Sequence, residues 1–204
     1  MKLILTPMLI LRLLFKPQEV FNSLSHTRPS AGGVFFGVAV WLIALPPVFA
    51  YIGSVNFGWR LGVGEPLMLP AGTLVLISLA YFLLILIGFF VTALLSRWMS
   101  YEYGARHSIG IHFAMITVVG TPLVVGSLVH LYPHAFINVL VLVPTVMWSS
   151  YILYKGLPIV LQTTPEQGML MASSLIGFLL VAYVSLLGIT VMLWGSGIGP
   201  SVGI

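Results

Sequence analysis

Long apolar runs, separated by short polar connections, are the dominant pattern of this sequence. A helix needs roughly 20 apolar residues to cross the hydrocarbon core of a bilayer, which is about 30 Å thick. Five runs have that length, namely Gly33–Ile52, Ala71–Leu95, Ser108–Leu131, His134–Tyr154 and Met169–Trp194. They lack the strand-length alternation of polar and apolar residues that is typical of a membrane barrel. The pattern therefore predicts five membrane-spanning helices.

The amino-acid composition agrees with a membrane protein. Only 6% of the residues are charged and 59% are hydrophobic, whereas about a quarter of the residues in a soluble domain are charged. The connections between the runs are too short for a separate soluble domain. We therefore expect an all-α, polytopic protein with a five-helix transmembrane bundle over residues 33–195 and a flexible C-terminal tail over residues 196–204.

Residues 1–32 are expected to form a cytoplasmic, amphipathic segment. Lys2, Arg12 and Lys16 fall in one narrow sector of a helical wheel, and leucines occupy other sectors. This arrangement suits a helix in the headgroup plane with its bases toward anionic lipid. An arm that binds a partner is the alternative. A second short helix is expected to begin near Pro17, because a missing N–H is tolerated in the first turn.

The basic residues predict an orientation. Of the eight Lys and Arg residues, only Arg60 lies in a connection that is outside when the N-terminus is cytoplasmic. Positive charge is retained on the cytoplasmic side of membranes, which favours an N-in, C-out arrangement. The net charge of +4 therefore anchors and orients helices, and it does not indicate nucleic-acid binding.

Prolines interrupt three of the predicted spans, at Pro46–Pro47, Pro122 and Pro144. Each proline in a helix interior removes one backbone hydrogen bond and kinks the helix. In lipid the freed carbonyl needs a partner within the bundle, and the hydroxyls of Thr121 and Thr145 could supply one. The kinks either shape packing or expose backbone to a solute. In the second case a polar path would be lined by Thr121, Pro122, Asn138 and Pro144.

Few residues could carry chemistry. The chain has no Cys and no Asp, and the five runs contain no Glu, Lys or Arg. Intramembrane enzymes and proton-coupled carriers usually place an ionisable residue in the membrane interior. We therefore expect no catalytic residue, no cofactor and no enzymatic activity.

The histidines are the remaining candidates for a metal site. His112 lies one turn into the third run, and a packed, hydrogen-bonded core histidine is expected there rather than a ligand. His130 and His134 flank a turn at Tyr132–Pro133 and are expected at the outer surface. Metal binding by this pair is the less favoured alternative, so we predict no metal site.

The most distinctive run lies at the end of the fourth span. Tyr151 and Tyr154 are expected at the cytoplasmic headgroups, Gly156 at the end of the helix and Pro158 at the restart of the chain. Thr164 then precedes Pro165 in the manner of an N-cap. This boundary is a candidate contact surface for a partner or for lipid, formed by Tyr151, Tyr154, Gly156 and Pro158.

Several short motifs, taken in order, resemble the Yip family of Ypt-interacting proteins and in particular its bacterial inner-membrane branch. They are Gly120-Thr-Pro-Leu123, Leu131-Tyr-Pro133, Tyr151-Ile-Leu-Tyr-Lys-Gly-Leu-Pro158, Glu166-x-Gly168 and Leu193-Trp-Gly195. The resemblance implies five spans, a cytoplasmic N-terminus and a location in the bacterial inner, or plasma, membrane. Eukaryotic members carry an acidic cytoplasmic motif before the first span, and Glu19 is the only acid before residue 65 here. A role with small GTPases is therefore not carried over.

Two functions remain open at this stage. The preferred expectation is a non-enzymatic integral protein that organises the membrane or assists a partner complex. The alternative is a small permease or channel for an ion or a small solute. The expected partners are membrane lipids, together with a protein partner or a second copy of the chain.

Overall fold

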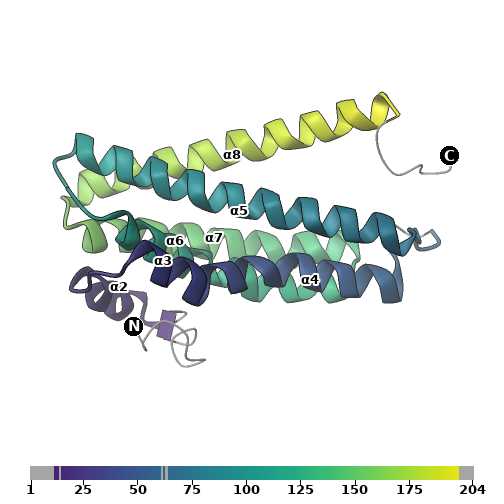
Figure 1. The fold of residues 1–204 in the computed structure, drawn as a ribbon, viewed down its shortest axis with the longest axis horizontal. Helices are drawn as coiled ribbons and strands as arrows, with labels where there is room; N and C mark the ends of the chain where they lie inside the picture. The colour runs from purple at the N-terminus through teal and green to yellow at the C-terminus, as the bar shows by residue number, and fades with distance from the viewer. Residues whose placement is uncertain (1–11, 14, 61, 63, 198–204) are drawn as a thin grey trace.

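The computed structural model describes residues 12–13, 15–60, 62 and 64–197. Its elements in this part of the chain are helical, and the prediction of an all-α protein is confirmed (Figure 1). The elements are α2 (Pro17–Ser25), α3 (Ala31–Val34), η1 (Phe35–Ala39), α4 (Val40–Phe57), α5 (Ala71–Glu102), α6 (Ile109–Gly126), η2 (Ser127–Leu131), α7 (Ala135–Leu161) and α8 (Pro165–Gly195).

Five stretches are long and apolar enough to cross a membrane, which confirms the predicted number of spans. They are Ala31–Phe57, Ala71–Glu102, Ile109–Leu131, Ala135–Leu161 and Pro165–Leu193. The first continues through α3, the π-helical turn η1 and α4. The second extends beyond its apolar run to Glu102. The fourth extends to Leu161, and its additional residues Leu157, Val160 and Leu161 are buried in the core.

The end of the fourth span differs from the prediction. Helix α7 does not stop at Gly156 but continues through Pro158 to Leu161. It ends at Gln162, which adopts a left-handed φ of 52° and donates its N–H to the carbonyl oxygen of Pro158. Gly156 is helical, and the ring of Phe21 packs against it so closely that there is no room for a Cβ. Gly156 therefore allows α2 and α7 to approach closely, and it does not end the helix.

The start of α8 agrees with the prediction. Thr164 Oγ1 accepts a hydrogen bond from Gln167 N–H at 3.3 Å, and Thr164 N–H donates to Gln167 Oε1 at 3.4 Å. This reciprocal pair is a capping box, which satisfies two backbone donors at the start of a helix. The connection between α7 and α8 is consequently only residues 162–164.

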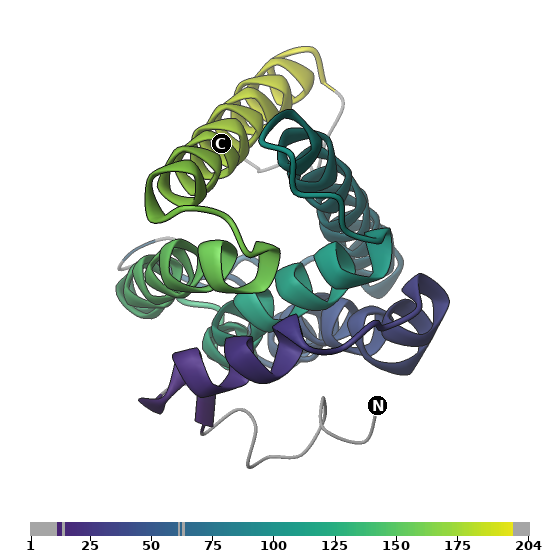
Figure 2. The same cartoon turned by 90° about the vertical axis from the view of Figure 1, so that its left-hand side faces the viewer.

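The core lies toward the end of the bundle where α2 docks. Helix α2 crosses α6 and α7 at that end (Figure 2). Its Val20, Phe21 and Leu24 are buried in the hydrophobic core cluster, which also includes Leu157 of α7 and Leu175 of α8. The short helix predicted near Pro17 is thus confirmed. The predicted headgroup-plane helix before it lies mostly outside the described residues.

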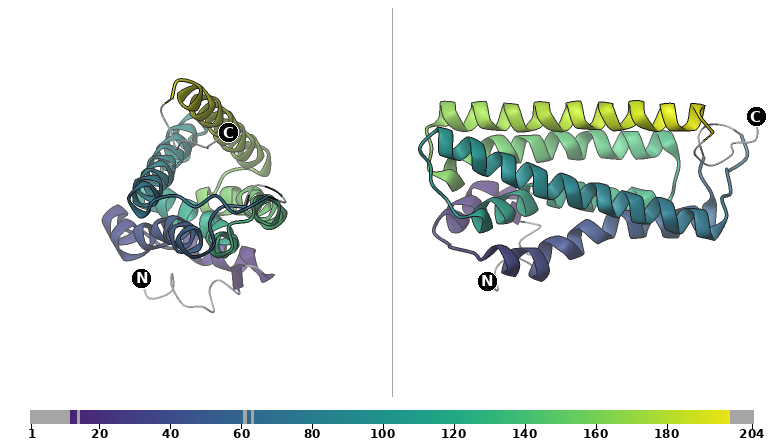
Figure 3. Two further views of the ribbon diagram at one scale, coloured as in Figure 1. Left: turned by 90° about the vertical axis from the view of Figure 1, so that its right-hand side faces the viewer. Right: turned by 45° about the horizontal axis from the view of Figure 1, so that its top comes forward.

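The opposite end is closed by a loop rather than a helix. Trp59 and Leu67 exchange two backbone hydrogen bonds, and Arg60 pairs with the backbone of Pro133 and Ala135. Nearby, Gly53 of α4 lies so close to the carbonyl of His130 that an added Cβ would overlap it. Helix α8 runs from the α2 end toward this end along one side of the bundle (Figure 3).

Candidate functional site

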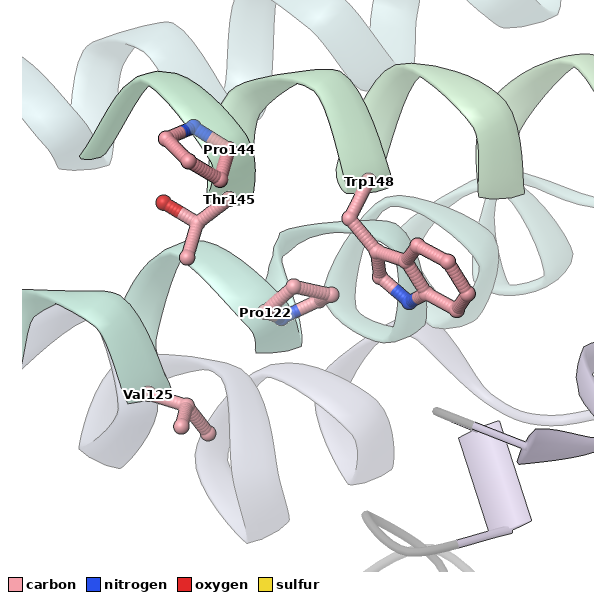
Figure 4. A pocket seen from close by; sticks show the side chains of 5 residues that line it. All are labelled: Pro122, Val125, Pro144, Thr145 and Trp148. Carbon is pink, nitrogen blue, oxygen red and sulfur yellow. The ribbon is translucent and has the colours of Figure 1, made fainter. Parts of the chain in front are cut away.

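A groove lies between α6 and α7 where prolines of the two helices face each other. It has a volume of about 260 Å³ and is lined by Pro122 and Val125 of α6 and by Pro144, Thr145 and Trp148 of α7 (Figure 4). Close to it the helices touch, because an added Cβ on Gly126 would lie 2.6 Å from Thr145 Cγ2. Proline rings and the bulky indole hold the helices apart beside that contact, which leaves the groove open.

The threonine hydroxyls near the two prolines do not donate hydrogen bonds to the carbonyls that the prolines leave without a backbone donor. A proline at position i leaves the carbonyl of residue i−4 without its donor, which here means Val118 and Leu140. Thr121 Oγ1 instead donates to Thr117 O at 3.0 Å, and Thr145 Oγ1 donates to Leu142 O at 2.8 Å. Both hydroxyls are satisfied within their own helices, so the groove walls are almost entirely apolar.

Asn138 belongs to a separate polar network at the loop-closed end. Its Oδ1 lies 2.5 Å from His130 Nδ1, and its Nδ2 donates to the carbonyls of Tyr132 and His134. The hydroxyl of Tyr81 on α5 lies 3.4 Å from His130 Nε2. The network holds the turn between η2 and α7. His130 is therefore buried within this network, at the loop-closed end of the bundle.

The structure thus divides the four residues of the predicted polar path. Pro122 and Pro144 meet at the groove. Thr121 is buried without lining the groove, and Asn138 holds the turn. Thr121 and Asn138 form their hydrogen bonds elsewhere, so the space that the two prolines line between α6 and α7 is apolar.

An aromatic stripe continues from the groove along α7. The ring centroids of Trp148 and Tyr151 are 5.5 Å apart, and Lys155 Nζ lies 6.0 Å from the centroid of the Tyr151 ring. We call Trp148, Tyr151 and Lys155 the α7 stripe. Successive members are three or four positions apart, which places them on one helix face. The spacing is visible in the sequence, but the role of Trp148 and Val125 in the groove was not predicted.

The predicted contact surface is partly internal. Tyr151 and Tyr154 are exposed, and the Tyr154 hydroxyl lies 2.9 Å from Ser173 Oγ of α8. Gly156 is covered by Phe21 of α2, and Pro158 packs so tightly on α8 that an added Cβ on Gly168 would lie 2.6 Å from Pro158 Cβ. Tyr151 is therefore the member of the set that combines exposure with a neighbouring cation.

The histidine in the third span has the predicted structural environment. His112 is fully buried, and its Nδ1 lies 2.9 Å from Ser96 Oγ on α5. His107, outside the span, binds the carbonyl of Leu161 through Nε2 at 2.9 Å and so ties the end of α7 to the α5–α6 connection. Within the described ranges, no three His, Cys, Asp or Glu residues gather as a metal site would require.

Comparison with known proteins places the chain in a family. The Yip1 domain model matches residues 11–187. Inner membrane protein YohC of Escherichia coli, from strain K12 and from O6:H1 strain CFT073, is 31% identical over 156 residues. These alignments cover 76% of this chain and 80% of each relative. No solved structure matches.

Proposed function

This chain belongs to the Yip1 domain family, and we propose that it is a non-enzymatic, multi-pass inner-membrane protein that organises the membrane or assists a partner complex. The location follows the relatives, which are named inner membrane proteins. In the described spans, Lys, Arg and Glu lie within about two turns of a helix end. A reaction centre in the hydrocarbon would need such groups deeper in the membrane.

The observation that carries the proposal is the uncovered length of α8. Helix α8 packs on α7 and α5 near its start, but from Gly177 onward nearly every described side chain is exposed. Val181, Val191 and Met192 are between 68% and 75% exposed. At 1.5 Å per residue, this part of the helix is about 28 Å long, close to the thickness of a hydrocarbon core. Such a helix offers one continuous surface to another membrane component.

The alternative, a small permease or channel, has less support. A solute path needs polar groups in series across the membrane. The groove between α6 and α7 is apolar. The hydroxyl of Thr121 forms a hydrogen bond with Thr117 beside the groove, whereas Asn138 forms one with His130 at the loop-closed end. Reconstituted vesicles provide the direct test, because rapid flux of an ion or small polar solute through the purified chain would favour this alternative.

The fold also supports the proposed N-in orientation. The ends of α2, α5 and α7 and the start of α8 lie together at one end of the bundle (Figure 1). The described Lys and Arg residues other than Arg60 lie at this end, because they belong to those segments or to the connections that join them. A cytoplasmic position for this end satisfies the positive-inside rule.

Single-cysteine crosslinking tests the proposal, because the natural chain has no cysteine. Val184→Cys and Val191→Cys place a thiol on the uncovered part of α8, and Leu76→Cys places one on an exposed face of α5. In native membranes we expect discrete crosslinked species from the α8 variants and few from the α5 control. A chain that remains monomeric, crosslinks from neither helix and shows no preference among lipids contradicts the proposal.

A further inference from the structure

We propose that the groove and the α7 stripe form a binding site for one anionic phospholipid, with an acyl chain in the groove and the phosphate at Lys155. The inference needs only that the spans lie in a bilayer, so it does not depend on a partner for α8. Three features of the described residues carry it, which are the depth of the groove, the continuity of the stripe and the charge at its end.

The first feature is depth. Pro144 lies eleven positions before Lys155 on the continuous helix α7, a rise of about 16 Å. Half of a hydrocarbon core is about 15 Å thick. When Lys155 reaches the headgroups, the groove at Pro144 therefore lies near the middle of the bilayer. An acyl chain that starts at the same headgroup level ends at this depth.

The second feature is the unbroken apolar surface between the two ends. Trp148 both lines the groove and neighbours Tyr151, whose ring faces the ammonium group of Lys155. Flat aromatic faces and proline rings give an extended hydrocarbon chain a rigid surface to lie on. Tyr and Trp favour this depth because one part of each ring system is apolar and another is polar.

The third feature is charge. In the part of the chain that the structure describes, the carboxylate ion pair is that of Lys16 with Glu19, and Lys155 has no carboxylate within bonding distance. An exposed ammonium group at the headgroup level attracts anionic lipid. A lipid with a net negative charge neutralises it, whereas a zwitterionic lipid carries a competing cation beside its phosphate.

The size of the groove selects a lipid chain over a protein helix. A helix with its side chains is about 10 Å or more across, and a groove of about 260 Å³ between two touching helices has no room for one. The opening lies beside Val125 and Trp148, which are 38% and 37% exposed. A chain can therefore enter sideways from the bilayer.

Native mass spectrometry with added lipid tests the site. The purified full chain is titrated with phosphatidylglycerol or with phosphatidylcholine of identical acyl chains, and we expect one tightly retained phosphatidylglycerol. Lys155→Gln should lower its affinity about fivefold, since one Lys near an anionic surface contributes about 1 kcal/mol. Lys16→Gln removes the same charge at the same end and should have a much smaller effect, because Lys16 already pairs with Glu19.

A second pair of variants tests the groove. Val125→Trp fills it, and Val139→Trp adds the same bulk at a position of α7 that is 60% exposed and outside the groove. We expect Val125→Trp to abolish the tightly retained lipid and Val139→Trp to keep it. Circular dichroism of each variant verifies the helical fold before the comparison.

Fluorescence quenching decides the matter if a groove variant fails to fold. Phosphatidylglycerol with bromine on its acyl chain should quench the wild type more than Trp148→Phe, and brominated phosphatidylcholine should show a smaller difference. The proposed site would be overturned by equal retention of the two lipids or by equal effects of the two lysine variants. Equal quenching of the wild type and of Trp148→Phe would also overturn it. A dimer that Val125→Trp dissociates would also overturn it, because a second copy would then occupy the groove.

The outcomes also separate this site from the proposed function. Loss of lipid selectivity while α8 still crosslinks to a partner would remove only the lipid site. Retained selectivity without any α8 crosslink would leave the lipid site intact and remove the partner complex.

Discussion

The third and fifth spans show opposite relations between hydropathy and burial. In the third span, Ile109–Leu131, the most apolar stretch of 18 residues has a mean hydropathy of 1.8, and 67% of that stretch is buried. In the fifth span, Pro165–Leu193, the corresponding mean hydropathy is 2.4, and 6% of the stretch is buried. In a soluble protein the more apolar helix would be inside. Here lipid tails are as apolar as leucine, so burial of apolar surface gives no hydrophobic gain. Small and polar residues such as Gly110, His112 and Thr117 are inside because they allow close packing and need hydrogen-bond partners.

The comparison also separates what holds the fold together from what is free to meet other molecules. The packed region combines α2, α6 and the last turns of α7, with Phe21 over Gly156 and Ser96 beside His112. The distal part of α8 adds little to the stability of the single chain. Variants in the first region should therefore destabilise the protein, and variants in the second should have little effect on its stability.

The largest expected effect is that of Phe21→Ala. The ring is fully buried between α2 and α7, and removal of a buried Phe side chain typically costs about 3–5 kcal/mol. Phe178→Ala on α8 is the matched control, because Phe178 is 39% exposed, and its effect should stay within about 0.5 kcal/mol. Reversible unfolding in mixed micelles, followed by circular dichroism, measures both values. Equal losses would show that α8 is packed against another molecule.

The next effect is expected from a pair of glycines. Gly110→Ala on α6 would place a Cβ against the backbone of Pro29 and Ala31, whereas Gly188 on α8 has open space around it. Overpacking of this kind costs about 1–3 kcal/mol, and Gly188→Ala should instead be neutral or stabilise the helix by up to about 1 kcal/mol. The same unfolding measurement applies. A destabilising Gly188→Ala would indicate a close neighbour that the single chain does not provide.

Ser96→Ala is expected to cost no more than Gly110→Ala. The substitution removes the partner of His112 Nδ1 in a fully buried position, and an unsatisfied buried polar group costs about 1–3 kcal/mol. Ser174→Ala on the exposed face of α8 controls for the loss of a hydroxyl. If Ser96→Ala leaves stability unchanged, the pair contributes no more than an exposed hydroxyl does, and polar burial in α6 needs another explanation.

The smallest effect is expected where the two regions meet. Tyr154→Phe removes only the 2.9 Å hydrogen bond to Ser173 that joins α7 to α8. Side-chain hydrogen bonds between membrane helices average about 0.6 kcal/mol, so a loss of that size should appear in the unfolding free energy. The double variant with Ser173→Ala should cost no more than either single one. Additive losses would show that the two hydroxyls do not interact.

Local sequence was sufficient wherever the bilayer or the chain's near neighbours decide the structure. Five apolar runs gave five helices, because hydrocarbon forces every backbone group in a span to bond within its own helix. Thr164 capped α8 as predicted, because its partner Gln167 is three residues away. His112 was predicted to pack in the core, since a polar side chain one turn into a span must find a partner there.

Tertiary structure decided what each kinked or small residue does. Gly156 looked like a helix end, yet its role depends on Phe21, a residue far away in the chain. Asn138 looked like part of a membrane path, yet His130 and the turn engage all its polar atoms. The facing of Pro122 and Pro144 across one groove depends on the rotation of α6 against α7. That rotation is set by packing over many contacts, so it cannot be predicted from the hydropathy along a single helix.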